Sequence, residues 1–224
     1  MVSIGFYLLT AIALFMMLFI FGFANNRKKA LNTFLFIVAI WLIYINYLSR
    51  SSLLVDLGIP PRMPLMVILP TLIASILITG LKSFRSILQN TPAWLPVYFQ
   101  SFRILVELLI FGAYLNGVLP QRVTFEGLNF DIIVGISAPI IAYLYMKKKI
   151  SALFLLSWNV FGLLILTLTG YAFLTAFYQY DFATISQNTE FFHIPYLLLP
   201  GVLLPLAIFL HIFSLRQAYM LTKA

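Results

Sequence analysis

Residues 100–119, QSFRILVELLIFGAYLNGVL, form a long apolar run that carries a full positive charge at Arg103 and a full negative charge at Glu107. The apolar residues follow one another without the alternation of a β-strand, so the run predicts a helix rather than a strand of a barrel. Similar runs recur along the chain, of which 62% is hydrophobic and only 9% is charged. We therefore predict an all-α membrane protein, because within lipid only helices and closed barrels satisfy every backbone polar group.

Seven apolar runs are each close to the ~20 residues that cross a bilayer as a helix. The first run lacks the positive start of a signal peptide and is followed by Arg27, Lys28 and Lys29, which indicates a retained helix. We predict a seven-transmembrane helix bundle that forms a single domain over residues 1–224. The expected spans are about 3–24, 31–49, 64–82, 93–119, 131–147, 150–175 and 195–218.

Positive charges are distributed unequally between the two sides of the predicted bundle. Ten lie on one side: Arg27, Lys28, Lys29, Lys82, Arg85, Lys147, Lys148, Lys149, Arg216 and Lys223. Three lie on the other: Arg50, Arg62 and Arg122. Cytoplasmic loops carry the excess of Lys and Arg, so we predict the N-terminus outside and the C-terminus in the cytoplasm. The net charge of +8 is then a topological signal, and we expect no nucleic-acid partner.

A polar stripe runs along the fourth predicted span. Gln100, Arg103, Glu107 and Tyr114 fall within roughly a 60° arc of a helix. Charged groups at membrane depth face the interior of a bundle or a water-filled cavity. We therefore expect the stripe to face inward, with Arg103 and Glu107 close enough to pair as i,i+4 neighbours.

Two further spans bring polar groups to a similar depth, namely Asn159 in the sixth and His211 in the seventh. We expect an intramembrane polar cluster, for which two interpretations stay open. It could be a site in which Glu107 titrates or coordinates, Arg103 is its counter-charge or an anion anchor, and His211 is a proton partner. It could instead be a buried ion pair with hydrogen bonds that fix helix packing. The predicted members are Gln100, Arg103, Glu107, Asn159 and His211.

A second, outer polar cluster is predicted near the extracellular ends of the spans. Asp131 lies at the start of the fifth predicted span, a position that is also typical of a residue capping a helix N-terminus. Glu126 and His193 are equally compatible with solvated loops. The predicted members are Arg122, Glu126, Asn129, Asp131 and His193.

Several cofactor-dependent classes are excluded by what the sequence lacks. The chain has no cysteine, and its last span carries no lysine that could bind retinal. The two histidines, His193 and His211, are 18 residues apart on one segment, roughly 27 Å if helical, so they cannot sandwich a haem. There is no HExxH, P-loop or GxGxxG motif. We predict no cofactor and no metal.

Three segments carry a resemblance to a known family: VTFEGLNFDIIVGISAP (123–139), SWN (157–159) and FHIPYLLLPGVLLPLAIFLHIFSLRQ (192–217). Together with QSFRILVELL they resemble a family of bacterial multipass membrane proteins with no known activity. The resemblance implies a seven-span protein of the bacterial cytoplasmic membrane and assigns no role to any residue.

Three functional hypotheses follow. The leading one is a polar intramembrane pocket, open to the outside, that binds or translocates a small solute or ion. The second is a sensor or an assembly subunit of a membrane complex, whose polar outer loops meet a protein partner. The third is an enzyme acting on a lipid or isoprenoid substrate through Glu126 and Asp131, with His193 close by. We favour a protein that is not an enzyme.

Overall fold

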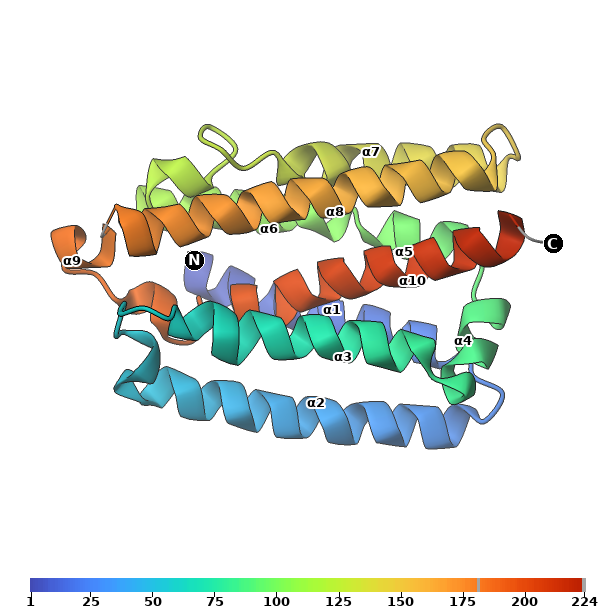
Figure 1. Cartoon of the computed structure of the whole chain (residues 1–224), viewed down its shortest axis with the longest axis horizontal. Coiled ribbons are helices and arrows are strands. Elements are labelled where there is room, and N and C mark those ends of the chain that lie inside the picture. The colour runs from blue at the N-terminus through green and yellow to red at the C-terminus, as the bar shows by residue number, and fades with distance from the viewer. Residues whose placement is uncertain (181, 223–224) are drawn as a thin grey trace.

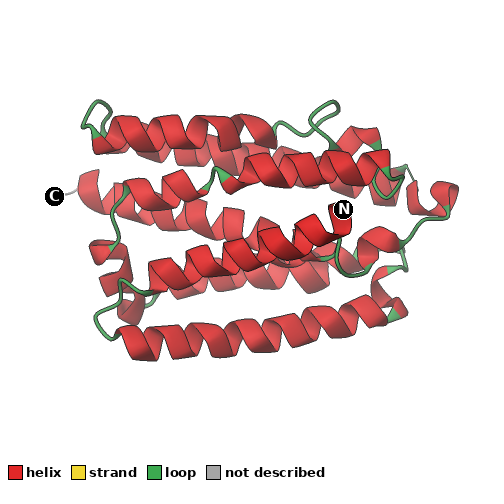
Figure 2. Cartoon of the chain, turned by 180° about the vertical axis from the view of Figure 1, so that it is seen from behind, coloured by secondary structure: helices red, strands yellow, loops and turns green. Residues whose placement is uncertain are grey.

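The computed structural model describes residues 1–180 and 182–222, so Asp181 and Lys223 lie outside the described part of the chain. Within that part the chain forms helices and contains no strand, which confirms the all-α prediction. The long helices run roughly parallel to one another as a bundle (Figure 1). Most loops lie at the two ends of this bundle (Figure 2).

Five helical segments are long and apolar enough to cross a membrane, so the chain is a helical membrane protein. They are α1 (Val2–Phe21), α2 (Arg27–Arg50), α5 (Trp94–Phe99) continued by α6 (Phe102–Leu115), α8 (Ala152–Leu174) continued by a π-turn (Thr175–Gln179), and a π-turn (Leu199–Leu203) continued by α10 (Leu204–Thr222).

A sixth segment qualifies if a bent pair of helices counts as one span. The pair bends by 71° between Pro64–Gly80 and Lys82–Asn90. A seventh segment, α7 (Asp131–Met146), has only 16 residues and is too short to count among them. Each of the seven predicted runs thus contains a helix, but two of them are bent or short. The remaining bounds are a π-turn (Pro64–Ile68), α3 (Leu69–Gly80), α4 (Arg85–Asn90) and α9 (Phe182–Ser186).

Helix α10 forms the centre of the bundle. Of the apolar stretch in the α10 span 72% is buried inside the protein, whereas only 17% of the corresponding stretch in α2 is buried. α10 packs most extensively against α8 and α3, which lie on either side of it (Figure 1). Polar side chains that point inward from α8 and α10 are therefore enclosed by protein.

Pro205 interrupts the hydrogen bonding at the start of α10. Because proline has no N–H, the carbonyl four residues earlier, that of Gly201, has no partner within the helix. The indole Nε1 of Trp41 on α2 donates to this carbonyl at 2.7 Å. A side chain from α2 thus satisfies the group that the proline leaves free.

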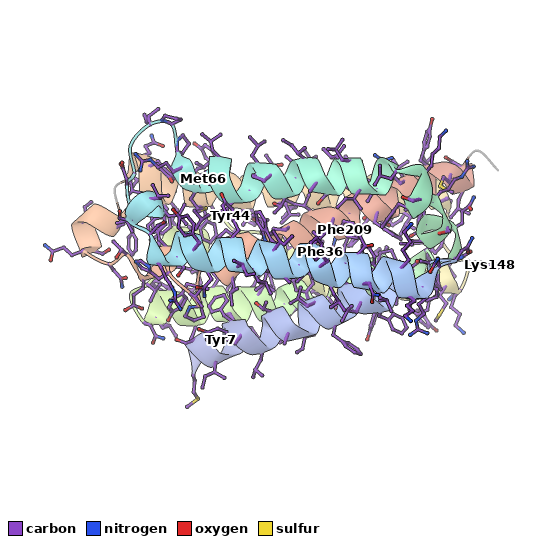
Figure 3. The ribbon with its side chains drawn as sticks, turned by 90° about the horizontal axis from the view of Figure 1, so that it is seen from below. Tyr7, Phe36, Tyr44, Met66, Lys148 and Phe209 are labelled. Atoms are coloured by element: carbon purple, nitrogen blue, oxygen red, sulfur yellow. The ribbon has the colours of Figure 1, made fainter. Side chains whose placement is uncertain are left out.

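The same arrangement recurs at α3. Pro70 leaves the carbonyl of Met66 without its helical partner. The hydroxyl of Tyr44 donates to that carbonyl at 3.2 Å, and the two residues lie next to each other (Figure 3). Since Trp41 and Tyr44 are three residues apart on α2, one face of this peripheral helix stabilises both proline-containing helices.

We expect Trp41→Phe to lower the free energy of unfolding by about 1 kcal/mol, because the Gly201 carbonyl loses its donor in apolar surroundings. The measurement is reversible unfolding of the detergent-solubilised protein with increasing sodium dodecyl sulfate. In a Pro205→Ala background the backbone N–H at position 205 can reach the Gly201 carbonyl, so the same substitution should cost less. Equal losses in both backgrounds would argue against this role of Trp41.

Candidate buried charge site and cavity

The segment between α6 and α7 returns into the bundle. α6 ends at Leu115 and α7 begins at Asp131, yet the Asp131 side chain contacts Arg103, roughly 18 Å back along α6 from its end. In Figure 1 the ribbon of α7 begins partway along α8, and in Figure 2 the chain leading into it runs along the bundle. Asn129 and Asp131 therefore lie deeper than the outer end at which the sequence placed them.

Non-helical backbone at membrane depth is tolerated where protein covers it. Val123, Thr124 and Asn129 in this segment are buried. The Asn129 amide Nδ2 donates to the Val123 carbonyl at 3.1 Å, and the Thr124 hydroxyl donates to the Gln121 carbonyl at 2.8 Å. The segment thus supplies several of its own hydrogen bonds where it lies within the bundle.

Arg103 and Asp131 form a buried, two-pronged ion pair. Arg103 Nε donates to Asp131 Oδ2 at 2.7 Å, and its Nη2 pairs with Asp131 Oδ1. Arg103 is 1% exposed and Asp131 4%. The carboxylate also lies at the N-terminus of α7, where the helix dipole favours negative charge.

The observed partner of Arg103 differs from the predicted one. In the described chain no hydrogen bond or ion pair joins Arg103 to Glu107. Arg followed by Glu at i,i+4 is the weaker order on a helix. Asp131 instead approaches from another helix and offers both oxygens to the planar guanidinium, which is the stronger geometry.

His211 contacts the other side of the guanidinium. Arg103 Nη1 lies 2.8 Å from His211 Nε2, and His211 Nδ1 lies 2.9 Å from Asn159 Oδ1. Because arginine can only donate, Nε2 must accept, so the ring proton is on Nδ1 and the imidazole is neutral. Asn159 is fixed in turn by donating to the Leu155 carbonyl and the Ser214 hydroxyl. His211 is therefore a partner of Arg103, and no hydrogen bond in the described chain joins it to Glu107.

Glu107 is held through an amide from the returning segment. Asn129 Nδ2 donates to both carboxylate oxygens, at 2.9 and 2.8 Å. Asn129 Oδ1 accepts from the Thr169 hydroxyl at 2.8 Å and from the Asp131 backbone N–H at 3.0 Å. The carboxylate thus has a single side-chain donor group, although it can accept about four hydrogen bonds.

A cavity of about 640 Å³ adjoins these charges. α3, α6, α8 and α10 contribute its walls, which are mostly aliphatic and aromatic side chains. Rim residues on α3 and α8, such as Leu72, Leu163 and Thr167, are partly or fully exposed, so the cavity opens sideways between these two helices. Its polar wall includes Arg103, Glu107, Asp131 and Thr169.

The formal charges of this site do not cancel when both acids are ionised. Arg103 contributes +1, Asp131 and Glu107 contribute −1 each, and the neutral His211 contributes nothing, which leaves −1. A net charge in low-dielectric surroundings is costly unless it is neutralised. The arrangement can therefore take up one proton or one cation, and Glu107 is the acid without an ion-pair partner.

Gln100 lies in the same stripe but contacts a different part of α10. Its amide Nε2 donates to the Ala207 carbonyl at 3.0 Å. It is fully buried, as are Arg103 and Glu107. Gln100 thus joins the start of α6 to α10 without bonding to the charged groups.

The remaining residues of the predicted outer cluster do not gather. Glu126 accepts a hydrogen bond from Gln121 at 3.2 Å on the surface. His193 Nδ1 lies 2.6 Å from the Ser49 carbonyl oxygen, at the end of α2. Glu126, His193 and the Asp131 carboxylate therefore each have separate partners.

Arg122, the fifth member of that cluster, contacts the C-terminal part of the α8 span. Its Nε donates to the Thr175 hydroxyl at 3.2 Å, and its guanidinium lies 4.7 Å from the centre of the Tyr180 ring. These contacts bind the loop before α7 to the adjacent span.

Two residues of the site were not predicted from the sequence. Gly162 leaves room for His211, because a Cβ at this position would lie 2.2 Å from the imidazole Cε1. Thr169 supplies the donor that orients the Asn129 amide. Both lie on the face of α8 that carries Asn159, three and ten residues further along, and that spacing is the sequence signal that could have revealed them.

Among the described residues, no group of three His, Asp or Glu side chains is placed to hold a metal ion. The fold and the site define a helical membrane protein with buried charges beside a laterally open cavity. No protein-family model, curated protein or solved structure matches the chain.

Proposed function

We propose that this chain is a protein of the bacterial cytoplasmic membrane that binds or translocates a small solute or ion in its intramembrane pocket, with Glu107 as the binding group. The observation that carries the proposal is Glu107, which lines the cavity and whose carboxylate has no ion-pair partner.

The charge balance gives this site two favourable states. Arg103 is already neutralised by Asp131 and bonded to His211. Glu107 is therefore neutral when it carries a proton, or it is compensated when a cation lies beside it. Since both states use the same carboxylate, proton and cation compete, and a protein that alternates between them exchanges one for the other.

Glu107→Gln removes the charge while nearly keeping the shape of the side chain. For the purified wild-type protein we expect cation binding that strengthens as pH rises, because protons leave the shared carboxylate. The variant should lose about tenfold or more in affinity, and the remaining binding should no longer depend on pH. The measurement is titration calorimetry with sodium, methylammonium and larger organic amines at several pH values.

Glu126→Gln is the matched control, since Glu126 is an exposed acid that lies outside the cavity wall. It should bind cations as the wild type does. If Glu107→Gln changes only thermal stability and no cation binding depends on Glu107, the carboxylate has a structural role and the proposal is wrong.

One observation favours a second candidate function, that of a sensor or an assembly subunit. An unbroken series of side-chain hydrogen bonds runs from Asp131 through Arg103 and His211 to Asn159. It links α6, α7, α8 and α10, as expected of a network that fixes helix packing. In that case the polar outer loops would meet a protein partner.

We further propose seven membrane spans, with the N-terminus outside and the C-terminus in the cytoplasm. Three features support this topology. The start of α1 and the end of α10 lie toward opposite ends of the bundle, as an odd number of crossings requires (Figure 1). The basic α7–α8 turn, marked by Lys148, lies at the end away from Tyr7 in α1 (Figure 3). The short α4 turns away from α3 by 71°, as expected of a helix at the membrane surface.

The absence of cysteine makes this topology directly testable, because every introduced thiol is unique. Exposed Ser52 and Glu190 should, as cysteines, react with a membrane-impermeant maleimide added to intact spheroplasts. Exposed Asn25 and Gln89 should react only after the membrane is permeabilised. The reverse pattern would invert the topology, and labelling of all four positions from outside would contradict the proposed crossings of α2 and α3.

A further inference from the structure

We propose that the cavity binds an amphipathic amine, whose protonated nitrogen meets Glu107 and whose apolar body lies in the groove between α3 and α8. This inference rests on the proposed function of Glu107 and adds the chemical class of the ligand and its route of access.

The walls of the cavity favour an apolar body. The π-turn before α3 and the first turn of α3 together present residues at i, i+4 and i+8, so these residues line one side of that helical segment. α8 contributes a matching stripe at spacings of three and four, and the central helix α10 forms the floor. These stripes are Pro64, Ile68 and Leu72 on α3 and the π-turn before it, Leu163, Leu166, Gly170 and Phe173 on α8, and Pro200, Leu203 and Ala207 on α10 and the π-turn before it.

A bare inorganic cation is poorly matched to such walls. Hard metal ions need several oxygen ligands, about six for Mg²⁺ and six to eight for Ca²⁺. Beside Glu107 the cavity wall offers the hydroxyl oxygen of Thr169 and the carboxylate of Asp131, which is already paired with Arg103. An organic ammonium needs only the carboxylate and fills the rest of the space with its own carbon atoms.

Anionic ligands are disfavoured by the charges around Glu107. The neighbouring titratable groups are Asp131 from α7, Arg103 from α6, His211 from α10 behind the arginine, and Tyr178, which lines the same cavity. The Arg103 guanidinium is engaged by Asp131 and His211, so its positive charge is compensated before a ligand arrives. A phosphate or carboxylate head would therefore meet the net negative charge of the site.

The cavity has the size and the opening that such a ligand requires. Its volume of about 640 Å³ falls within the range of small-molecule sites. It opens between α3 and α8, both of which show exposed apolar side chains such as Ile73 and Leu164 on their outer faces. In a membrane these faces contact lipid chains, so a ligand that partitions into the bilayer reaches the site from the side.

Gly170 gives a direct way to block the apolar part of the site. It lines the cavity, and a Cβ added there would have nothing within 4 Å. Gly170→Leu therefore places a side chain in the space proposed for the ligand body. Gly170→Ala adds one methyl group and is the matched control.

The experiment measures dissociation constants of the full-length protein in nanodiscs by titration calorimetry. The probes are 4-phenylbutylamine, its matched anion 4-phenylbutanoate, and the small cations methylammonium and sodium. The amine with the apolar body should bind about tenfold or more tightly than each of the other three. Glu107→Gln and Gly170→Leu should each weaken this binding about tenfold or more, and Gly170→Ala should change it by less than about threefold.

Each alternative outcome has a distinct meaning, provided that a cooperative unfolding transition shows each variant to be folded. If sodium or methylammonium binds through Glu107 as tightly as phenylbutylamine, and Gly170→Leu has no effect, the ligand class is wrong and the function of Glu107 stands. If phenylbutanoate binds more tightly than the amine, the site prefers anionic ligands and the inference is overturned. If no probe binds in a manner that depends on Glu107, this inference and the proposed function both fail.

Discussion

Asp131→Ala is expected to lower the free energy of unfolding by about 3–5 kcal/mol, the largest effect of any single substitution proposed for this chain. The substitution leaves the Arg103 guanidinium buried, at 1% exposure, without its bidentate partner. His211 cannot replace the lost carboxylate, because it is neutral and only accepts one hydrogen bond from Arg103. Unfolding in detergent with sodium dodecyl sulfate measures the loss.

Glu126→Ala serves as the control for this substitution, because Glu126 is an exposed acid in the same returning segment. Its removal should change stability by less than about 0.5 kcal/mol. A loss below about 1 kcal/mol for Asp131→Ala would show that Asp131 is solvated, as a surface helix cap would be.

Gly162→Val is expected to cost about 2–3 kcal/mol through overpacking. The first carbon added at this position would overlap the imidazole of His211, at 2.2 Å from Cε1 and 2.5 Å from Nε2. The ring must then move, which breaks its contacts with both Arg103 and Asn159. The same unfolding measurement detects this loss.

Gly170→Val, two turns further along α8, is the matched control because a Cβ there meets nothing within 4 Å. This substitution should leave stability within about 0.5 kcal/mol of the wild type. Similar losses at the two positions would mean that α8 simply tolerates no β-branched residue, and that contact with His211 is not the cause.

Sequence alone predicted the helical class and the inward direction of the polar stripe. Both follow from local patterns, because hydropathy over about 20 residues identifies a span and the helical period assigns the face. Gln100, Arg103 and Glu107 of that stripe are buried in the structure, and Tyr114 is partly buried. Glu107 also lies in a cavity wall, which no local pattern could reveal.

The ion-pair partner of Arg103 could not be predicted in the same way. Counting residues from the ends of the spans assumes that each helix starts at the membrane surface. α7 departs from that assumption, since the segment before it returns into the bundle and places Asn129 and Asp131 beside Glu107 and Arg103. Depth in this region is thus set by tertiary contacts rather than by position along the chain.

His211 illustrates a different limit. Its depth suggested a proton partner for Glu107, but its contacts are with Arg103 and Asn159. The rotation of α10 decides which neighbour the imidazole meets, and the space left by Gly162 fixes where the ring lies. Neither quantity is encoded in the spacing of the polar residues on a single helix.

A double-mutant cycle between Arg103 and Asp131 tests most directly whether these two residues pair and leave Glu107 without an ionic partner. The variants are Arg103→Met, Asp131→Leu and both together, compared by unfolding free energy in the same detergent. We predict a coupling of about 2–3 kcal/mol, with the double variant more stable than Asp131→Leu alone, and a smaller coupling in the parallel cycle of Arg103→Met with Glu107→Gln. Additivity within about 0.5 kcal/mol for Arg103 and Asp131, with the strong coupling found instead for Arg103 and Glu107, would contradict the account.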